Sequence, residues 1–286
     1  MFDLDSYRET IDTMISFPTD FSHYEFIRKQ AKDKQTKEGF DFPVEYMFKD
    51  VPKELYGKDN AVGITLEQMD IHGIRFGMIG CEDELAQRAL KEHPDRFIPS
   101  MGVDPNEGME AVRRIVRNHE THGIRAVTAF PAGCFPQVPI NDKKFYPIYA
   151  KCCELDLPIF VCSGVPGPRL RMMAQHVELI DEVMYDFPDL TFVTRHGCEP
   201  WADLAVKLML KWPGLHYSTS AFAPKYYPKA IIDYANTRGA DKVIYAGYFP
   251  MGLSLDRIFS DMPKVPLKDE VWPKFLSENA KRLLKL

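Results

Sequence analysis

The side chain best suited to chemistry in this sequence is a histidine that follows a short strand-like run. Thr191–Thr194 is rich in β-branched and aromatic residues, which predicts a strand, and His196 with Gly197 then breaks the pattern. Glu199 and Pro200 follow, and proline is typical of the first positions of a helix. His196 therefore lies at a strand-to-helix boundary, where enzymes with parallel sheets keep catalytic residues. Its imidazole could act as a general acid or base, or could only satisfy nearby backbone groups.

The elements that must position this histidine are short apolar runs alternating with helix-like stretches. Gly73 and Gly123 end two of these helices, as expected for a left-handed C-terminal position. The expected strands are Thr10–Ser16, Ile74–Ile79, Arg96–Met101, Ile124–Ala129, Pro158–Ser163, Thr191–Thr194, Leu215–Ser218 and Lys242–Ala246. Such a pattern implies parallel pairing, and eight strands close most naturally into an α/β fold of the (β/α)8 TIM-barrel type. An open doubly wound sheet is the alternative, but no GxGxxG or P-loop follows an early strand.

Length and composition favour one large domain. The chain has 286 residues, 45% of them apolar, which fits a single barrel spanning residues 1–286 better than two small domains. Residues 17–60 form a long insertion after the first strand, rich in aromatic and charged residues and interrupted by Pro43 and Pro52. Since long connections inside compact domains are usually functional, we expect a lid or pocket wall. A packed excursion over the barrel rim is the alternative.

Charge and composition argue against several classes of partner. The net charge is −5 and the basic residues are dispersed, so no nucleic-acid-binding surface is predicted. No apolar run is long enough to span a membrane, and the N-terminus lacks the features of a secretory signal. These features predict a soluble, cytoplasmic protein and leave open whether it forms a homo-oligomer. The six cysteines form no CxxC pair and are expected to be reduced thiols.

Several segments together resemble a known family. FPDLTFVTRHGCEPW, GADKVIYAGYFPMG and the terminal LSENAKRLLKL are similar to segments of the amidohydrolase superfamily, specifically its aminocarboxymuconate-semialdehyde-decarboxylase-like branch. IDTMISFP and LPIFVCSG match two further family positions in the same order. The resemblance implies the barrel fold and a site at the strand ends, and it is weakest across Pro18 to Asn60.

The resemblance also implies where the family's metal ligands would fall. The His-x-His motif after the first strand corresponds here to Met14 and Ser16, the histidine after the fifth strand to Cys162, and the aspartate after the eighth to Tyr248. All four ligand positions are replaced. The histidine that acts as general acid/base in the family's decarboxylases corresponds to His196 and is kept.

These replacements decide which chemistry is expected. A zinc site needs about three nitrogen or carboxylate ligands, and the thioether of Met14 and the hydroxyl of Ser16 are poor substitutes. We therefore expect neither a metal nor another cofactor. Without a Lewis acid the enzyme suits an already activated, carboxylate-bearing small molecule, and hydrolysis of a lactone, thioester or β-dicarbonyl compound is the primary prediction. A decarboxylase or other carbon–carbon lyase is one alternative, and a non-catalytic barrel kept as a binding or scaffold module is the other.

Residue roles follow from the strand ends. We predict that His196 is the general acid/base and that Tyr248 donates to a developing oxyanion, while Met14, Ser16 and Cys162 bind substrate. Cys162 could be a nucleophile paired with His196. We favour a pocket-wall role for it, because a buried thiol has a raised pKa and no third orienting residue is evident.

Three arginines could bind a substrate carboxylate. Arg169 and Arg171 lie in the expected loop after the fifth strand, and Arg169 is the best placed of the three on sequence grounds. The alternative is that these arginines pair with surface acids. Arg195 is expected to point away from His196, because neighbouring residues of a strand alternate in direction.

Overall fold

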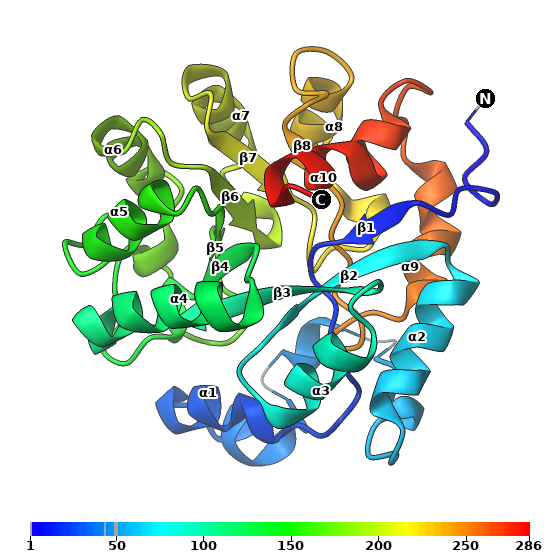
Figure 1. The fold of residues 1–286 in the computed structure, drawn as a ribbon, viewed down its shortest axis with the longest axis horizontal. Coiled ribbons are helices and arrows are strands. Elements are labelled where there is room, and N and C mark those ends of the chain that lie inside the picture. Colours follow the sequence, from blue (N-terminus) through cyan, green and yellow to red (C-terminus); the bar gives the residue numbers. More distant parts are fainter. Residues whose placement is uncertain (1, 43, 49–50) are drawn as a thin grey trace.

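Eight parallel strands form the centre of the molecule, each paired with the next along the chain. Figure 1 shows them in a computed structural model that describes residues 2–42, 44–48 and 51–286. Their bounds are β1 Thr10–Asp12, β2 Ile74–Gly80, β3 Phe97–Val103, β4 Ala126–Ala129, β5 Ile159–Cys162, β6 Phe192–Arg195, β7 Leu215–Ser218 and β8 Val243–Ile244. The predicted eight-stranded α/β barrel is confirmed, since these strands match the expected runs in order and place.

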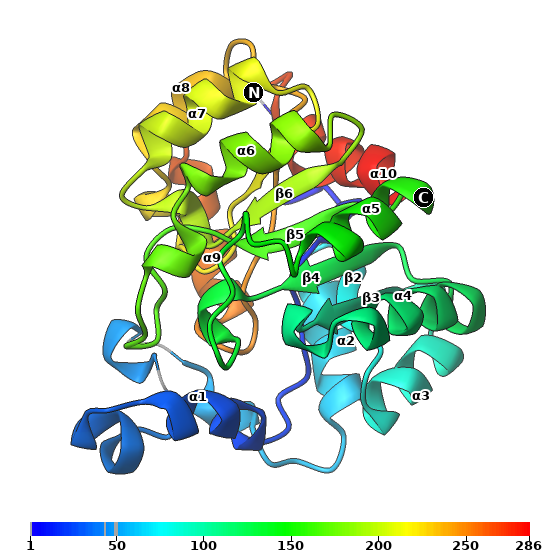
Figure 2. The same cartoon turned by 90° about the vertical axis from the view of Figure 1, so that its left-hand side faces the viewer.

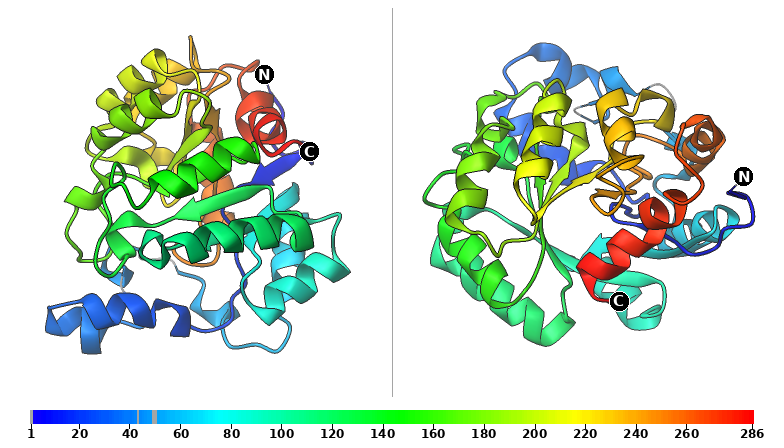
Figure 3. Two further views of the ribbon diagram at one scale, coloured as in Figure 1. Left: turned by 60° about the vertical axis from the view of Figure 1, so that its left-hand side comes forward. Right: turned by 90° about the horizontal axis from the view of Figure 1, so that it is seen from above.

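Helices lie around the outside of the strands, as Figure 3 shows from above. The helices that connect successive strands are α2 Ala61–Ile71, α3 Glu84–Glu92, α4 Met109–His122, α5 Tyr146–Glu154, α6 Leu179–Asp186, α7 Ala202–Lys211 and α8 Lys229–Ala235. Local sequence sets their ends. The Asp83 carboxylate accepts the Ala86 N–H at 2.7 Å to cap α3, and Gly123 ends α4 with a left-handed φ of 61°.

The barrel interior is filled by one inward-facing apolar side chain from most strands. Two residues of the C-terminal helix α10 (Asn279–Leu284) pack into the same cluster and close the end of the barrel where the strands begin. The strand residues of this cluster are Ile11, Met78, Ile98, Ala126, Phe160, Val193 and Ile244. Because this interior is packed, any ligand site must lie above it, at the end where the strands finish.

Side chains join the first and last strands where regular pairing stops. The Thr13 hydroxyl donates to the Tyr245 carbonyl at 3.0 Å, and the Gly247 N–H donates to Asp12 Oδ1 at 2.9 Å. Asp12 Oδ1 also accepts the Met14 N–H at 2.9 Å, which turns the chain out of β1. β1 therefore ends at Asp12, four residues before the predicted end at Ser16, because the Asp12 carboxylate replaces backbone pairing here.

Where the structure describes it, the insertion contains one α-helix, α1 Glu25–Gln30, and several short helical turns. Figure 2 shows it, in dark blue, as a layer apart from the helices that flank the strands. Its own small apolar cluster includes Tyr24, Ile27, Phe42 and Val44. The helix α9 (Leu255–Asp261) follows β8. Within the described residues, none of the helices has both the length and the apolar character that crossing a bilayer would require.

Candidate active site

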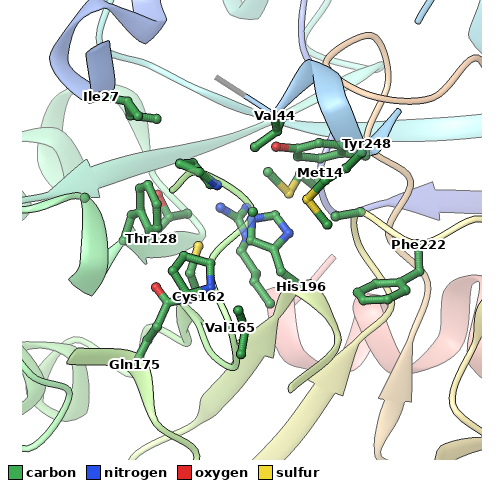
Figure 4. A pocket seen from close by; sticks show the side chains of 18 of the residues that line it. Met14, Ile27, Val44, Thr128, Cys162, Val165, Gln175, His196, Phe222 and Tyr248 are labelled. Atoms are coloured by element: carbon green, nitrogen blue, oxygen red, sulfur yellow. The ribbon is translucent and has the colours of Figure 1, made fainter. Parts of the chain in front are cut away.

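A cavity of about 1480 Å³ lies above the packed interior, between the strand ends and the insertion. Residues at the ends of several strands or just after them form its lower wall, and Ile27, Val44 and other insertion residues line the cavity from the opposite side (Figure 4). The lower-wall residues include Met14, Thr128, Cys162, Arg195, His196, Phe222 and Tyr248. Side chains far apart in the sequence therefore meet in one chamber, which is how barrel enzymes assemble their sites.

Arg195 lies at the bottom of this cavity. Its guanidinium carbon is 5.5 Å from the centre of the Phe160 ring, which belongs to the packed interior. Its Nη2 donates to the Thr13 carbonyl at 3.3 Å, so the side chain reaches from the end of β6 to the chain that follows β1. Since β1 and β6 are not neighbours in the sheet, the arginine spans the barrel beneath the cavity.

The charge of Arg195 has no close counter-charge. Among the described residues no carboxylate lies within the 4.0 Å of an ion pair, and Nε is inaccessible to solvent and without a hydrogen-bond partner. Burial lowers the pKa of this guanidinium, while the more distant Asp12 and Glu82 raise it. Arg195 is only partly exposed, and a poorly hydrated cation without a counter-charge is unfavourable, so the site as it stands is suited to receive an anion.

The expectation that Arg195 points away from His196 is wrong. Arg195 faces the barrel interior by the normal alternation of β6, but His196 follows it with a left-handed φ of 64°, which ends that alternation. Both side chains therefore line the cavity. Gly197 continues the turn with φ 82°, and a Cβ at this position would lie 2.4 Å from the Phe222 ring, so only glycine fits.

His196 is held in place by Ser220. The His196 N–H donates to the Ser220 hydroxyl oxygen at 3.1 Å, and the same hydroxyl is 3.2 Å from His196 Nδ1. Because that oxygen already accepts the backbone N–H, its own proton is available for Nδ1, which favours the tautomer with the proton on Nε2. Burial, followed by the positive charge of Arg195, lowers the pKa of His196 to about 3. The imidazole is therefore neutral in the free protein.

Tyr248 and Cys162 flank His196, as Figure 4 shows. The Tyr248 ring meets the His196 ring edge to face, with 5.3 Å between ring centres. Burial raises the pKa of the Tyr248 hydroxyl well above its usual range, so it remains a hydrogen-bond donor. Burial likewise raises the pKa of the Cys162 thiol to about 12. A neutral thiol is a poor nucleophile, which agrees with the preferred wall role of Cys162.

Two of the predicted substrate-binding residues do not line the cavity. Ser16 is absent from its wall and contributes backbone hydrogen bonds instead, donating its N–H to the Phe249 carbonyl at 3.0 Å. Arg169 pairs with Asp33 at 2.6 Å, donates to Gln35 at 3.0 Å and lies over the Tyr46 ring at 4.7 Å. Its partners all belong to the insertion and it does not line the cavity, so the role of Arg169 in binding a substrate carboxylate gains no support here and stays a prediction. Met14 does line the cavity.

The donors present do not fit the divalent metal of the family resemblance. Within the described part of the chain, no group of three or more His, Cys, Asp or Glu side chains could hold a metal ion. The replaced positions that line the cavity offer a thioether at Met14, a neutral thiol at Cys162 and a neutral phenol at Tyr248. The Arg195 charge beside them would repel a second cation.

Comparison with solved structures shows the same fold. The chain is similar to an uncharacterised TIM-barrel protein from Bordetella bronchiseptica, with 23% identity, a TM-score of 0.75 and coverage of 97% of this chain and 98% of that one. It is also similar to 5-carboxyvanillate decarboxylase from Novosphingobium aromaticivorans, solved with manganese, with 17% identity, a TM-score of 0.69 and coverage of 99% and 97%. A third is 2,6-dihydroxybenzoate decarboxylase from Rhizobium, with 16% identity, a TM-score of 0.65 and coverage of 97% and 99%.

Sequence comparison identifies the family. No curated protein matches the chain. The amidohydrolase family model matches residues 50–286, which is well over half of the sequence and includes every strand except β1. The chain therefore belongs to the amidohydrolase family and is an enzyme.

Proposed function

We propose that the protein is a metal-independent decarboxylase of small, anionic carboxylic acids. The observation that carries this proposal is the convergence of a cation, Arg195, and two hydrogen-bond donors, His196 and Tyr248, at the bottom of one cavity. The fold likeness to two decarboxylases supports this alternative over the hydrolysis predicted first from the sequence. Hydrolysis also needs a base to activate water or a nucleophile, and this site supplies neither readily.

The reason lies in the ionisation of the candidate groups. A histidine with a pKa of about 3 is a weak base, and a thiol with a pKa of about 12 is largely protonated at neutral pH. Decarboxylation does not require either group as a nucleophile. It requires stabilisation of the electron pair that the departing CO2 leaves behind, followed by delivery of one proton to carbon.

The residues can perform these steps on an activated acid. The bond between the carboxylate and its neighbouring carbon breaks, CO2 leaves, and the electron pair is delocalised into the rest of the substrate. A bound anion offsets the Arg195 charge and so raises the pKa of His196, which takes up one proton as the substrate binds. His196 transfers this proton to the reacting carbon, after CO2 has left a β-oxo acid or before it leaves a 2-hydroxyaryl acid, while the Tyr248 hydroxyl donates a hydrogen bond to the anionic oxygen. Overall, one acid anion and one proton are consumed, and one CO2 and one neutral product are formed.

The test is CO2 release from a panel of 2-hydroxyaryl and β-oxo acids, measured on chelator-treated protein. His196→Asn is expected to lower turnover by about a hundredfold to ten-thousandfold, the usual range for loss of a general acid. His122→Asn, at an exposed residue near the end of α4, is the matched control and should leave turnover unchanged. Equal turnover of the wild type and His196→Asn would remove His196 from the mechanism.

A further inference from the structure

We infer that the Arg195 guanidinium binds the substrate oxygen that gains negative charge as CO2 leaves. This inference rests on the proposed decarboxylase function and assigns to Arg195 a role of its own in it. In a β-oxo acid, the electron pair of the breaking bond moves directly onto the keto oxygen. In a 2-hydroxyaryl acid it can do so only after the carbon that carries the carboxylate has been protonated, because the ring is then in its keto form, and CO2 leaves as the aromatic ring is restored.

The position of Arg195 is the first argument. Its side chain lies on Phe160 at the top of the packed interior and is tied to the Thr13 carbonyl on another side of the barrel. These two contacts hold the guanidinium at the floor of the cavity. Arg195 therefore offers a preorganised positive charge at the floor of the cavity. This charge lies near Cys162 and Tyr248, the two residues at positions where the family resemblance places metal ligands.

The unsatisfied state of Arg195 is the second argument. Its Nε has no partner among the described residues, and the nearest buried carboxylate, Asp12, is occupied by the N–H groups of Met14 and Gly247. The protein therefore keeps a cation available at the cavity floor rather than neutralising it. Because Arg195 lines the cavity, an anionic oxygen bound there would supply the counter-charge that this arginine lacks.

The energetics of the reaction decide which substrate oxygen Arg195 binds. A cation that bound the leaving carboxylate would stabilise a charge that must disappear as neutral CO2 forms, and this would slow the reaction. A cation that contacts the oxygen receiving the electron pair stabilises the transition state more than the bound acid. Only the second arrangement makes this arginine catalytic. The apolar side chains of Met14, Val165 and Phe222, which line the same cavity, suit the departing CO2.

The test uses 4-nitrophenol, whose phenolate absorbs visible light and imitates the oxygen anion formed in the reaction. We expect wild-type protein to bind the phenolate in preference to the phenol and to increase the ionisation of the bound probe at least tenfold. Arg195→Gln should abolish this increase and Arg195→Lys should keep part of it. Arg171→Gln, at an exposed arginine, is the matched control and should behave as wild type. Absence of binding, or the same increase in Arg195→Gln, would overturn the inference.

Kinetics then separate this inference from the proposed function. With an active acid, Arg195→Gln is expected to lower kcat by about a hundredfold to a thousandfold, as for loss of an oxyanion donor, with a smaller change in KM. Unchanged kcat in an active decarboxylase would refute the role of Arg195 and leave the function standing. If nitrophenol is ionised in an Arg195-dependent way but no acid releases CO2, the anion-binding role of Arg195 stands and the proposed decarboxylase function is refuted.

Discussion

Replacing Asp12 by asparagine should change how the stability of the protein depends on pH. The Asp12 side chain is buried, and Oδ2 makes no hydrogen bond of good geometry within the described residues, although the Tyr245 hydroxyl is near it. Burial raises the pKa of this carboxyl from 3.8 to about 7, against the lowering effect of the Gly247 and Met14 N–H groups. The folded protein thus holds this proton far more tightly than the unfolded chain does.

The sign and the size follow from linkage. A folded pKa above the unfolded value means that the contribution is fully present below about pH 3.8 and is lost as the pH rises through about 7. Between about pH 5 and pH 8 the loss amounts to about 2.5 kcal/mol of unfolding free energy. Asparagine keeps the Oδ1 acceptor for both N–H groups but does not titrate, so Asp12→Asn should abolish this part of the decline.

The assay is urea denaturation of both proteins at about pH 5 and about pH 8. We expect Asp12→Asn to gain about 2.5 kcal/mol relative to wild type between the two pH values, and comparison with the wild type cancels other titrating groups. Asp59→Asn, at an exposed aspartate, is the control and should show no such gain. The same pH dependence in wild type and Asp12→Asn would refute the assignment of a protonated, buried carboxyl.

Three further variants test the site and its cover. Ser220→Ala should lower kcat about tenfold with little change in KM, because His196 loses the group that fixes its tautomer, and Ser220→Thr should restore most of the lost kcat. An unchanged NMR signal of the His196 tautomer in Ser220→Ala would contradict this role of Ser220. Cys162→Ala should mainly change KM, and near-complete loss of kcat in both Cys162→Ala and Cys162→Ser would instead make it a nucleophile. Arg169→Ala should speed limited proteolysis within residues 17–60, because Asp33 and Tyr46 of the insertion lose their contact with Arg169, while the free energy of global unfolding changes by less than about 1 kcal/mol. Equal cleavage rates in the wild type and Arg169→Ala would show that Arg169 does not hold the insertion.

The strands and helix ends were predictable because their signals are local. Runs such as Thr191–Thr194 carry apolar, β-branched residues, and Gly123 carries its own conformational preference. The error in Arg195 came from a local rule that fails at one residue. Strand alternation describes β6 correctly but stops at His196, whose left-handed φ no sequence pattern announces.

The remaining site features depend on contacts across the chain. Arg169 has its partner Asp33 136 residues away, so its sequence neighbourhood could not show that the insertion, rather than a substrate, uses its charge. Ser220 was missed for the same reason, since nothing near it in the sequence connects it to His196, 24 residues earlier. The glycine directly after His196 was the local sign that the chain turns here, but it did not show which way the His196 side chain points.

The central claim is that a fixed guanidinium, and not a bound metal, provides the positive charge for decarboxylation. The most direct test is CO2 release from 2-hydroxyaryl and β-oxo acids by chelator-treated protein whose metal content is measured in parallel. The account predicts turnover with metal far below one atom per chain, no stimulation by added manganese or zinc, and loss of turnover in Arg195→Gln. Turnover that appears only after manganese or zinc is added, and that survives Arg195→Gln, would contradict it.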